Sequence, residues 1–544
     1  MKKRLLALIL TVVMVMTVFT ACGKKTENAD GGVNIEDDDK NEDVKDDDNG
    51  DDGEEKRASI LNLYKERFCD GAYSNSEVYS GYIAYMEYEV LHLMEEDAKK
   101  YPELNEALEN LAKGAVANIK EVYKDAKDAA YEEFDEEHPE NCMLYNIKEL
   151  YSVRRADETV VSIEQSYEAY LGGAHGQYAT LPDNFDTKTG ESINFTDVVT
   201  DVDKAYERIS AIIKEKYADS LDIFLSDLTF TEYKNNEFPQ LFMIDYDGIT
   251  VIYNPYDIAP YSVGQITVKL SYEDNKDILN EKYFTNVPES YALQLSPFDE
   301  YITDIDGDGV LDSMTVIPYF PELNENAESI AFIINGENHE IKDEDMYVFS
   351  INTYLVKTKG GKCYVYLEGI GLNDYTTCFV YEIGKDSVKK VKEVDGNVAD
   401  LGYITEPGED YKWLMGMILD PEKVSLSVRT DLFGTCQISK VYAIGEDGIP
   451  VTAQEVYTFT TTVDYTVKKA MTFKKVDEEG NEIGEYELKV GEHVYAYRTD
   501  ADTYVDAKLS DGTIVRFNVT SKEWPYCIDG VDIQELFEDV FFAG

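Results

Sequence analysis

Helical periodicity is concentrated in the first half of this chain and returns only near its last residues, and that distribution limits the fold more than any other feature of its 544 residues. From Pro102, apolar residues recur every three or four positions for about 30 residues, which predicts an amphipathic helix with proline in its first turn. Residues 202–217 show the same period. Beyond residue 290, short alternating segments separated by polar turns predict strands. This order predicts an α+β module followed by an all-β region.

The length requires several domains, because a single hydrophobic core stops growing near roughly 250 to 300 residues. The predicted order is a signal peptide over residues 1–22, a disordered acidic linker over 23–57, an α+β binding module over 58–285, a β-repeat region over 290–455, and a small β-barrel with a C-terminal helix over 456–544. Within the module we expect strands at 78–93, 145–155 and 159–171, and a hairpin of 242–245 with 249–253.

The first 57 residues indicate export. Lys2, Lys3 and Arg4 precede an apolar run over residues 5–19, as in a secretory signal, and Cys22 follows after Thr20-Ala21. This ending resembles the bacterial lipobox, which implies that Cys22 is lipidated, with palmitate among its acyl chains, and anchors the protein to the outer face of the cytoplasmic membrane. Ordinary secretion, with Cys22 incidental, is the alternative. The acidic segment that follows is expected to be a disordered tether, because it contains almost no apolar residues.

The net charge of −59 excludes one class of partner. Such a field repels nucleic-acid phosphate and anionic lipid, and it attracts cationic proteins and divalent metal ions. We therefore expect no nucleic-acid binding, and membrane contact only through the lipid anchor.

Six cysteines follow Cys22, and in an exported chain they could form disulfides. Six cysteines allow fifteen pairings, so the spacing alone does not determine the pattern. If one disulfide forms, we expect Cys363 to pair with Cys378 across a hairpin.

Two turn-rich segments of the module contain candidate partner-binding residues. In residues 166–197, Gly172 and Gly173 allow a sharp change of direction, and His175 follows them. We interpret His175 as a turn residue, with partner binding as the alternative. Residues 254–264 carry candidate contacts on a stiff backbone, although such residues also end strands. These candidates are Pro255, Tyr256, Pro260 and Tyr261.

Three ordered motifs, YLGGAHG at 170–176, NFDTKTG at 184–190 and YDIAPYSVG at 256–264, resemble the extracellular module of RsiV-type proteins. That module occurs in lysozyme-sensing anti-sigma factors and in the N-terminal part of some peptidoglycan deacetylases. The resemblance covers roughly residues 75–272 of this chain. It implies an envelope-facing binding module whose partner is lysozyme or peptidoglycan.

Catalytic motifs are missing from the sequence. The deacetylase domain of that family needs an H-x-x-x-H pair, whereas the histidines of this chain never come within four residues of one another. There is no G-x-S-x-G motif, and 109 acidic residues make any single carboxylate pair uninformative. The sequence therefore predicts a protein that is not an enzyme. The histidines are His92, His138, His175, His339 and His493.

The motif with the clearest chemistry is the aspartate loop, residues 304–312, with the sequence DIDGDGVLD. Its alternating carboxylates, its glycine at the sixth position and the carbonyl of its seventh residue are what a calcium ion needs from a short loop. The expected ligands are Asp304, Asp306, Asp308, Val310 and Asp312. Strand-like flanks, and Thr315 where an EF-hand has Glu, favour a structural calcium loop between strands. An acidic turn without an ion is the alternative.

The rest of the C-terminal half predicts repeated strands. Residues 378–386 and 436–447 share a Val-Tyr and an Ile-Gly pair, which predicts blade-like β-repeats. From about residue 459 the pattern resembles the SH3-like barrels of bacterial envelope proteins, and residues 531–542 predict a capping helix.

Together these features predict a surface-anchored lipoprotein that binds or senses a cell-envelope ligand. One alternative is a cell-wall hydrolase whose active site is hidden among the carboxylates. The other is a structural surface protein stabilised by calcium.

Overall fold

The computed structural model describes residues 57–74, 81–225, 228–296, 299–320, 327, 329–342, 350–371, 376–398, 400–404, 412–460 and 463–543. The predicted signal peptide, Cys22 and nearly all of the acidic linker lie outside these residues. In this described part of the chain, no helix is both long enough and apolar enough to cross a membrane.

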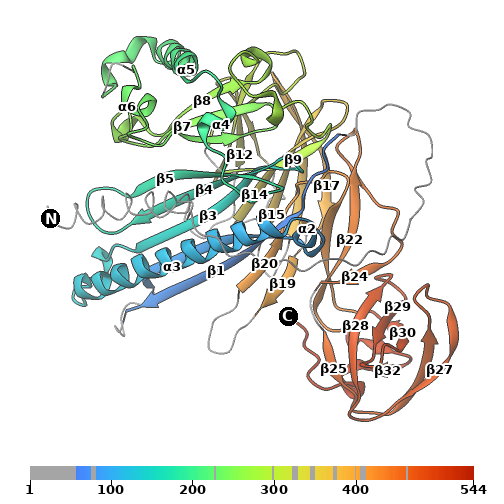
Figure 1. The fold of residues 1–544 in the computed structure, drawn as a ribbon. Helices are drawn as coiled ribbons and strands as arrows, with labels where there is room; N and C mark the ends of the chain where they lie inside the picture. The colour runs from blue at the N-terminus through green and yellow to red at the C-terminus, as the bar shows by residue number, and fades with distance from the viewer. Residues whose placement is uncertain are drawn as a thin grey trace, which may run out of the picture. The chain divides into compact units, whose positions relative to one another are not determined.

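A large sheet is the main sheet of the α+β module (Figure 1). Among the described residues it has seven strands in the order β19-β20-β1-β2-β3-β4-β5. The neighbours β2 and β3 are parallel, and such a pair needs a long crossover, which α2 and α3 provide. The bounds are β1 Leu63–Tyr73, β2 Tyr82–Leu93, α2 Glu95–Lys100, α3 Pro102–Glu133, β3 Tyr145–Ala156, β4 Val160–Tyr170, β5 Gln177–Asp186, β19 Asp400–Ile404 and β20 Lys412–Gly416.

Helix α3 confirms the helix expected from Pro102, and its apolar stripe covers one face of the large sheet. Leu104 packs in one buried cluster with Tyr151 of β3, and Ile119 packs in a second cluster with Tyr88 of β2. Burial of this stripe stabilises the helix, because a helix of this kind gains most of its stability from tertiary packing.

A small sheet of β6, β7 and β8 completes the module. It shares a hydrophobic core with α5, whose buried Tyr206, Ile209 and Ile213 follow the predicted helical spacing. The predicted helix at 202–217 and the predicted hairpin are therefore confirmed. The bounds are α4 Phe195–Val198, α5 Val202–Lys216, α6 Thr231–Lys234, β6 Leu241–Ile244, β7 Gly248–Tyr253 and β8 Ile266–Ser271.

Two antiparallel sheets follow and share one core. Among the described residues, their orders are β17-β16-β15-β14-β9 and β10-β11-β12-β13. Phe332 of β12 and Tyr381 of β16 meet in this core with ring centroids 5.2 Å apart. The bounds are β9 Tyr291–Leu295, β10 Tyr301–Thr303, β11 Asp312–Tyr319, β12 Ser329–Ile334, β13 Glu337–Ile341, β14 Ser350–Lys357, β15 Cys363–Ile370, β16 Thr376–Gly384 and β17 Ser387–Asp395.

The remaining strands form one branched sheet around a C-terminal core that contains Phe433, Phe473 and Phe517. Its main path is β18-β21-β22-β24-β28-β29-β30-β26-β27 in the described part of the chain. The bounds are β18 Asn397–Val398, β21 Val424–Thr430, β22 Cys436–Ile444, β23 Pro450–Val451, β24 Tyr457–Phe459, β25 Asp464–Thr466, β26 Met471–Val476, β27 Glu482–Leu488, β28 His493–Thr499, β29 Tyr504–Lys508, β30 Ile514–Ser521, β31 Cys527–Ile528, β32 Val531–Asp532 and α7 Ile533–Leu536.

Several predictions for the C-terminal half are not confirmed. The described strands form no closed barrel, so the SH3-like barrel remains unconfirmed. The two segments predicted to repeat lie in β16 and β22, which belong to different sheets. The predicted capping helix over 531–542 is wrong in extent, because β32 pairs with β31 and leaves only the short α7.

The predicted disulfide between Cys363 and Cys378 is also wrong, since both thiols are free. On the paired strands β15 and β16, Cys363 lies opposite Ile383, whereas Cys378 lies opposite Glu368. Positions 363 and 368 differ by an odd number, so the two thiols point to opposite faces of the sheet. Cys363 accordingly belongs to one buried cluster and Cys378 to another.

Candidate functional site

The glycine cluster of residues 172–176 forms the turn between β4 and β5. Gly172 and Gly173 have φ angles of +81° and +115°, which favour glycine. A Cβ atom on Gly172 would also lie 2.7 Å from the Tyr145 hydroxyl. The turn therefore depends on both glycines, and it presents His175 to solvent.

The second candidate segment, between β7 and β8, lies against this turn. Tyr261 stacks on His175 with ring centroids 4.2 Å apart and an interplanar angle of 25°. The Tyr261 hydroxyl donates a hydrogen bond to the Gly176 carbonyl at 2.9 Å, and His175 Nδ1 lies 2.7 Å from the same oxygen. Two motifs that are 80 residues apart in the sequence therefore form one structure.

Hydrogen bonds between one side chain and the backbone hold the two segments in this arrangement. The buried Asn254 side chain accepts from the Thr180 N–H at 2.8 Å and donates to the Thr180 carbonyl at 3.0 Å. This pair of bonds fixes the start of the second segment to β5. The loop that follows is thereby placed beside the glycine turn.

Four aromatic side chains gather here, and we call them the tyrosine–histidine surface: His175, Tyr178, Tyr256 and Tyr261. Tyr178 meets the Tyr261 ring edge-on at 5.6 Å, and Tyr256 lies 5.8 Å from Tyr261. Tyr256 is 59% exposed, so the surface offers a ring face to a ligand. Pro255 and Pro260 each precede one of these tyrosines in the chain. Tyr178 was not predicted, because its only signal in the sequence is its place two residues after the glycine cluster.

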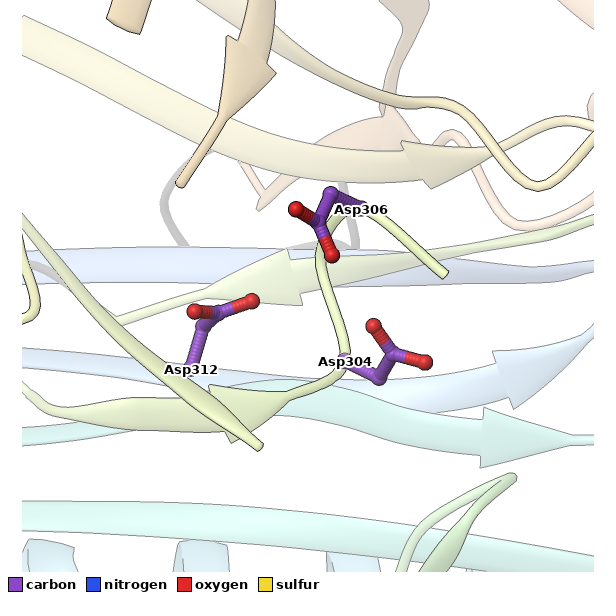
Figure 2. Close-up of side chains that lie close together, drawn as sticks. All are labelled: Asp304, Asp306 and Asp312. Carbon is purple, nitrogen blue, oxygen red and sulfur yellow. The ribbon is translucent and has the colours of Figure 1, made fainter. Parts of the chain in front are cut away.

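The aspartate loop connects β10 to β11, as the predicted strand flanks required. Carboxylate oxygens of Asp304, Asp306 and Asp312 lie within 4.8 Å of one another (Figure 2). Asp308, another predicted ligand, falls outside this group of carboxylates. The fifth predicted ligand, the backbone carbonyl of Val310, stays a prediction. Three convergent carboxylates supply the hard oxygen atoms that calcium prefers.

Lysine side chains already neutralise part of this loop. Lys385 Nζ lies 3.3 Å from Asp306 Oδ2 and 3.0 Å from Asp308 Oδ2. Lys357 Nζ donates to the Asp304 carbonyl at 3.2 Å. A divalent cation would meet a suitable set of ligands but would compete with the Lys385 ammonium for Asp306.

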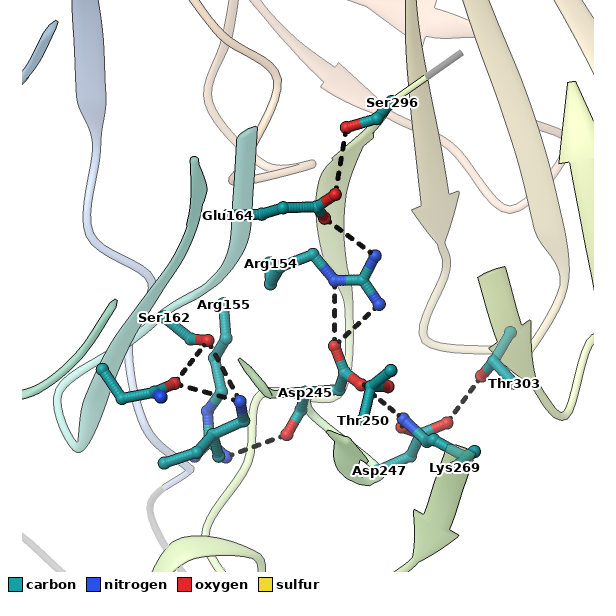
Figure 3. A network of polar contacts seen from close by, with 12 residues as sticks. Arg154, Arg155, Ser162, Glu164, Asp245, Asp247, Thr250, Lys269, Ser296 and Thr303 are labelled. Atoms are coloured by element: carbon teal, nitrogen blue, oxygen red, sulfur yellow. Dashed lines mark hydrogen bonds and ion pairs between the residues drawn. The ribbon is translucent and has the colours of Figure 1, made fainter. Parts of the chain in front are cut away.

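A buried ion cluster joins the large sheet to the small sheet (Figure 3). It begins at a β-bulge: Val153 of β3 lies opposite Ile163 of β4, and Arg155 lies opposite Ser162, so Arg154 is the extra residue. Because of the bulge, the side chains of both arginines reach the neighbourhood of Asp245 at the end of β6.

Asp245 is the centre of this cluster. Arg154 Nε donates to Asp245 Oδ1 at 3.0 Å, Lys269 Nζ lies 2.7 Å from Oδ2, and Thr250 donates to Oδ2 at 2.6 Å. Burial opposes the charge on Asp245, but Arg154 and Lys269 hold the pKa of this carboxyl well below its usual range. Lys269 also contacts Asp247, which accepts a hydrogen bond from Thr303 of β10 at 2.7 Å. The cluster therefore ties three sheets together.

A pair of carboxyl groups lies at the other end of the cluster. Glu164 is buried, with Arg154 at 3.4 Å and the Ser296 hydroxyl at 3.4 Å. Asp299 lies beside it and is half-buried. Burial, the charge of Glu164 and a hydrogen bond to Glu164 raise the pKa of Asp299 to about 8. This shift favours the protonated form of Asp299, whose hydroxyl can donate a hydrogen bond to Glu164.

Two family models match the α+β module. A model described as "Deacetylase PdaC" matches residues 84–178, and one described as "Protein of unknown function (DUF3298)" matches residues 196–273. His175 and Tyr178 lie in the first matched segment, and Tyr256 and Tyr261 lie in the second. The tyrosine–histidine surface is thus assembled from both.

Among curated proteins, the chain is similar to the peptidoglycan-N-acetylmuramic acid deacetylase PdaC of Bacillus subtilis (strain 168). The two are 26% identical over 191 residues, which make up 34% of this chain and 39% of that protein. The chain therefore spans about two fifths of the length of this relative.

Two solved structures of DUF3298 proteins are also similar. The one from Bacteroides fragilis NCTC 9343 is 19% identical, covers 41% of this chain and 96% of its own, and has a TM-score of 0.30. The one from Pseudomonas aeruginosa PAO1 is 21% identical, with the same two coverages and a TM-score of 0.27.

These comparisons support a module associated with peptidoglycan deacetylases, whereas the RsiV-like and SH3-like assignments are not confirmed. They contradict the prediction that the chain is not an enzyme, because the PdaC family model and a deacetylase both match it. The prediction rested on the absence of a few known catalytic motifs from the sequence. It could not recognise carboxyl groups that only the fold brings together, such as Glu164 and Asp299.

Proposed function

We propose that this chain is a cell-envelope protein that binds peptidoglycan through the tyrosine–histidine surface. The similarity to a peptidoglycan deacetylase supports the choice of ligand. The observation that carries the proposal is the stacked His175 and Tyr261 pair with the exposed Tyr256 ring beside it. An anchor at Cys22, proposed from the sequence, would hold this module next to the wall.

The chemistry of the surface fits a glycan. Aromatic rings present flat apolar faces, and tyrosine and histidine add polar groups at the ring edges. Sugar rings have the complementary arrangement of C–H faces and hydroxyl edges. Preformed stacking and the Asn254 bonds lower the entropy lost on binding, because the rings are already held in place.

Replacing Tyr256 with alanine should weaken retention on purified peptidoglycan about fivefold, since one aromatic contact contributes roughly 1 kcal/mol. Co-sedimentation of the full chain with wall sacculi measures this. Tyr319→Ala is the matched control, because Tyr319 is similarly exposed, at 55%, but lies on β11. Equal retention of the Tyr256→Ala and native chains would contradict the proposal. Soluble lysozyme serves as a second ligand, and binding to lysozyme alone would also contradict it.

A second candidate function is hydrolysis of a wall bond, favoured by the carboxyl pair of Glu164 and Asp299. A carboxylic acid that keeps its proton at neutral pH can act as a general acid. Asp299 has this property, is partly accessible, and contacts a second carboxyl group. The similarity to a deacetylase supports a hydrolytic reaction on the same polymer.

Under this second function, the native chain should release acetate or reducing ends from purified wall, and Asp299→Asn should slow release on the order of 100-fold. The rate should fall as pH rises through about 8, because Asp299 then loses the proton that it donates. Asp125→Asn, an exposed carboxyl on α3, is the control. If Asp299→Asn releases product as fast as the native chain, the Glu164 and Asp299 pair is not the active site. If the native chain releases neither acetate nor reducing ends, the chain does not hydrolyse the wall.

We also propose that the aspartate loop binds calcium and thereby stabilises the β region. Asp304, Asp306 and Asp312 would hold the ion, whose positive charge would offset the repulsion among these carboxylates. The role is structural, because the loop and the first residue of β11 together supply the ligands.

Calcium should raise the melting temperature of the native chain relative to a sample in EDTA. The stabilisation should reach about 2.7 kcal/mol at a calcium concentration 100-fold above the dissociation constant. Asp304→Asn should abolish the shift. Lys385→Ala should lower the calcium concentration needed, because it removes the competing ammonium. Asp386→Asn, an exposed carboxyl nearby, should leave the shift intact. If calcium does not change the melting temperature of the native chain, the proposed calcium site in the aspartate loop is contradicted.

A further inference from the structure

An open cavity of about 580 Å³ lies in the C-terminal region, in a part of the chain that neither family model covers. Its size is within the range of about 300 to 1,000 Å³ that is usual for small-molecule sites. Six of its lining residues carry the chemistry considered below: Asp431, Trp524, Tyr526, Gln534, Phe541 and Phe542.

The aromatic residues form a rigid wall with exposed faces. Phe542 stacks on Tyr526 with ring centroids 4.8 Å apart and an interplanar angle of 11°, and Trp524 meets Phe542 edge-on at 5.7 Å. Trp524 is nonetheless 68% exposed, and Phe541 is 66% exposed. Large apolar side chains that gather at one exposed cavity indicate a binding surface.

Polar acceptors lie at the same cavity. Asp431 Oδ1 accepts hydrogen bonds from Thr435 and Arg429, and Gln534 Nε2 donates to the Val540 carbonyl at 3.3 Å. Asp431 Oδ2 and Gln534 Oε1 accept no hydrogen bond from the described residues. These two oxygens can therefore accept hydrogen bonds from hydroxyl groups of a ligand.

The types of residue that line the cavity indicate which class of ligand it can bind. None of the described lining residues is Lys, Arg or His, and one is Asp, so an anionic ligand would be poorly accommodated. Flat aromatic faces beside carboxylate and carboxamide oxygens match a pyranose ring, which has an apolar C–H face and hydroxyl donors. We propose that this cavity binds a neutral oligosaccharide of pyranose rings, stacked on Trp524 and Phe541. This site is separate from the tyrosine–histidine surface and from the function proposed for it.

Tryptophan fluorescence tests this site directly, because the sequence contains only Trp413 and Trp524. In the full chain carrying Trp413→Phe, Trp524 is the only tryptophan, and it lies at the cavity. Titration with tetra-N-acetylchitotetraose should produce a saturable change in emission. Adding Phe541→Ala should raise the dissociation constant about fivefold. Sorbitol, which has hydroxyl groups but no ring face, should give no saturable change at the same concentrations.

The opposite results would overturn the proposal. These are no saturable change with the tetrasaccharide, an equal response to sorbitol, or an affinity unchanged by Phe541→Ala in a variant whose melting temperature is native. Tyr256→Ala in the same background separates this site from the first, since it should weaken wall retention and leave the Trp524 titration unchanged. If the chain is still retained on the wall but Trp524 emission does not change with the tetrasaccharide, only the cavity site is excluded, and the tyrosine–histidine surface is not.

Discussion

The buried carboxylate of Asp245, held between Arg154 and Lys269, is the interaction on which the module depends. Two cations and the Thr250 hydroxyl compensate for the loss of its hydration. Without one cation, the sheet junction would contain an uncompensated charge. The bulge on β3 is what allows Arg154 to leave the regular alternation of the strand and reach this carboxylate. The ion pair between Arg154 and Asp245 therefore depends on the bulge in β3.

The candidate ligand surface follows from this junction. β4 and β5 belong to the large sheet, whereas the loop with Tyr256 and Tyr261 extends from the small sheet. Only when the two sheets are joined can Tyr261 stack on His175. Each of the two matched family segments supplies half of the surface. The module should therefore act as one unit, in which the ion cluster holds together the two sheets that carry the aromatic rings of the proposed binding surface.

Local patterns predicted the local structure well. The spacing of Leu104, Leu108 and Ile119 was enough to place α3, because apolar residues with that period fall on one face of an α-helix. The glycines of the β4–β5 turn and the strand flanks of the aspartate loop were recognised for similar reasons. The large sheet was not foreseen in full, since β20 pairs with β1 across more than 340 residues. Tyr178, the Glu164 and Asp299 pair and the Trp524 cavity also depend on contacts between distant segments, which no periodicity encodes.

A double-mutant cycle between Arg154 and Asp245, measured by urea unfolding, tests the central claim most directly. Arg154→Met and Asp245→Asn should each lower the free energy of unfolding by about 3 to 5 kcal/mol, because each leaves a buried charge without its partner. The double variant should lose less than the sum of the two by roughly 1 to 3 kcal/mol, since the second change removes an interaction already broken. Losses that add to within about 0.5 kcal/mol would show that the two residues act independently. That result would contradict the account of how the sheets, and with them the aromatic surface, are held together.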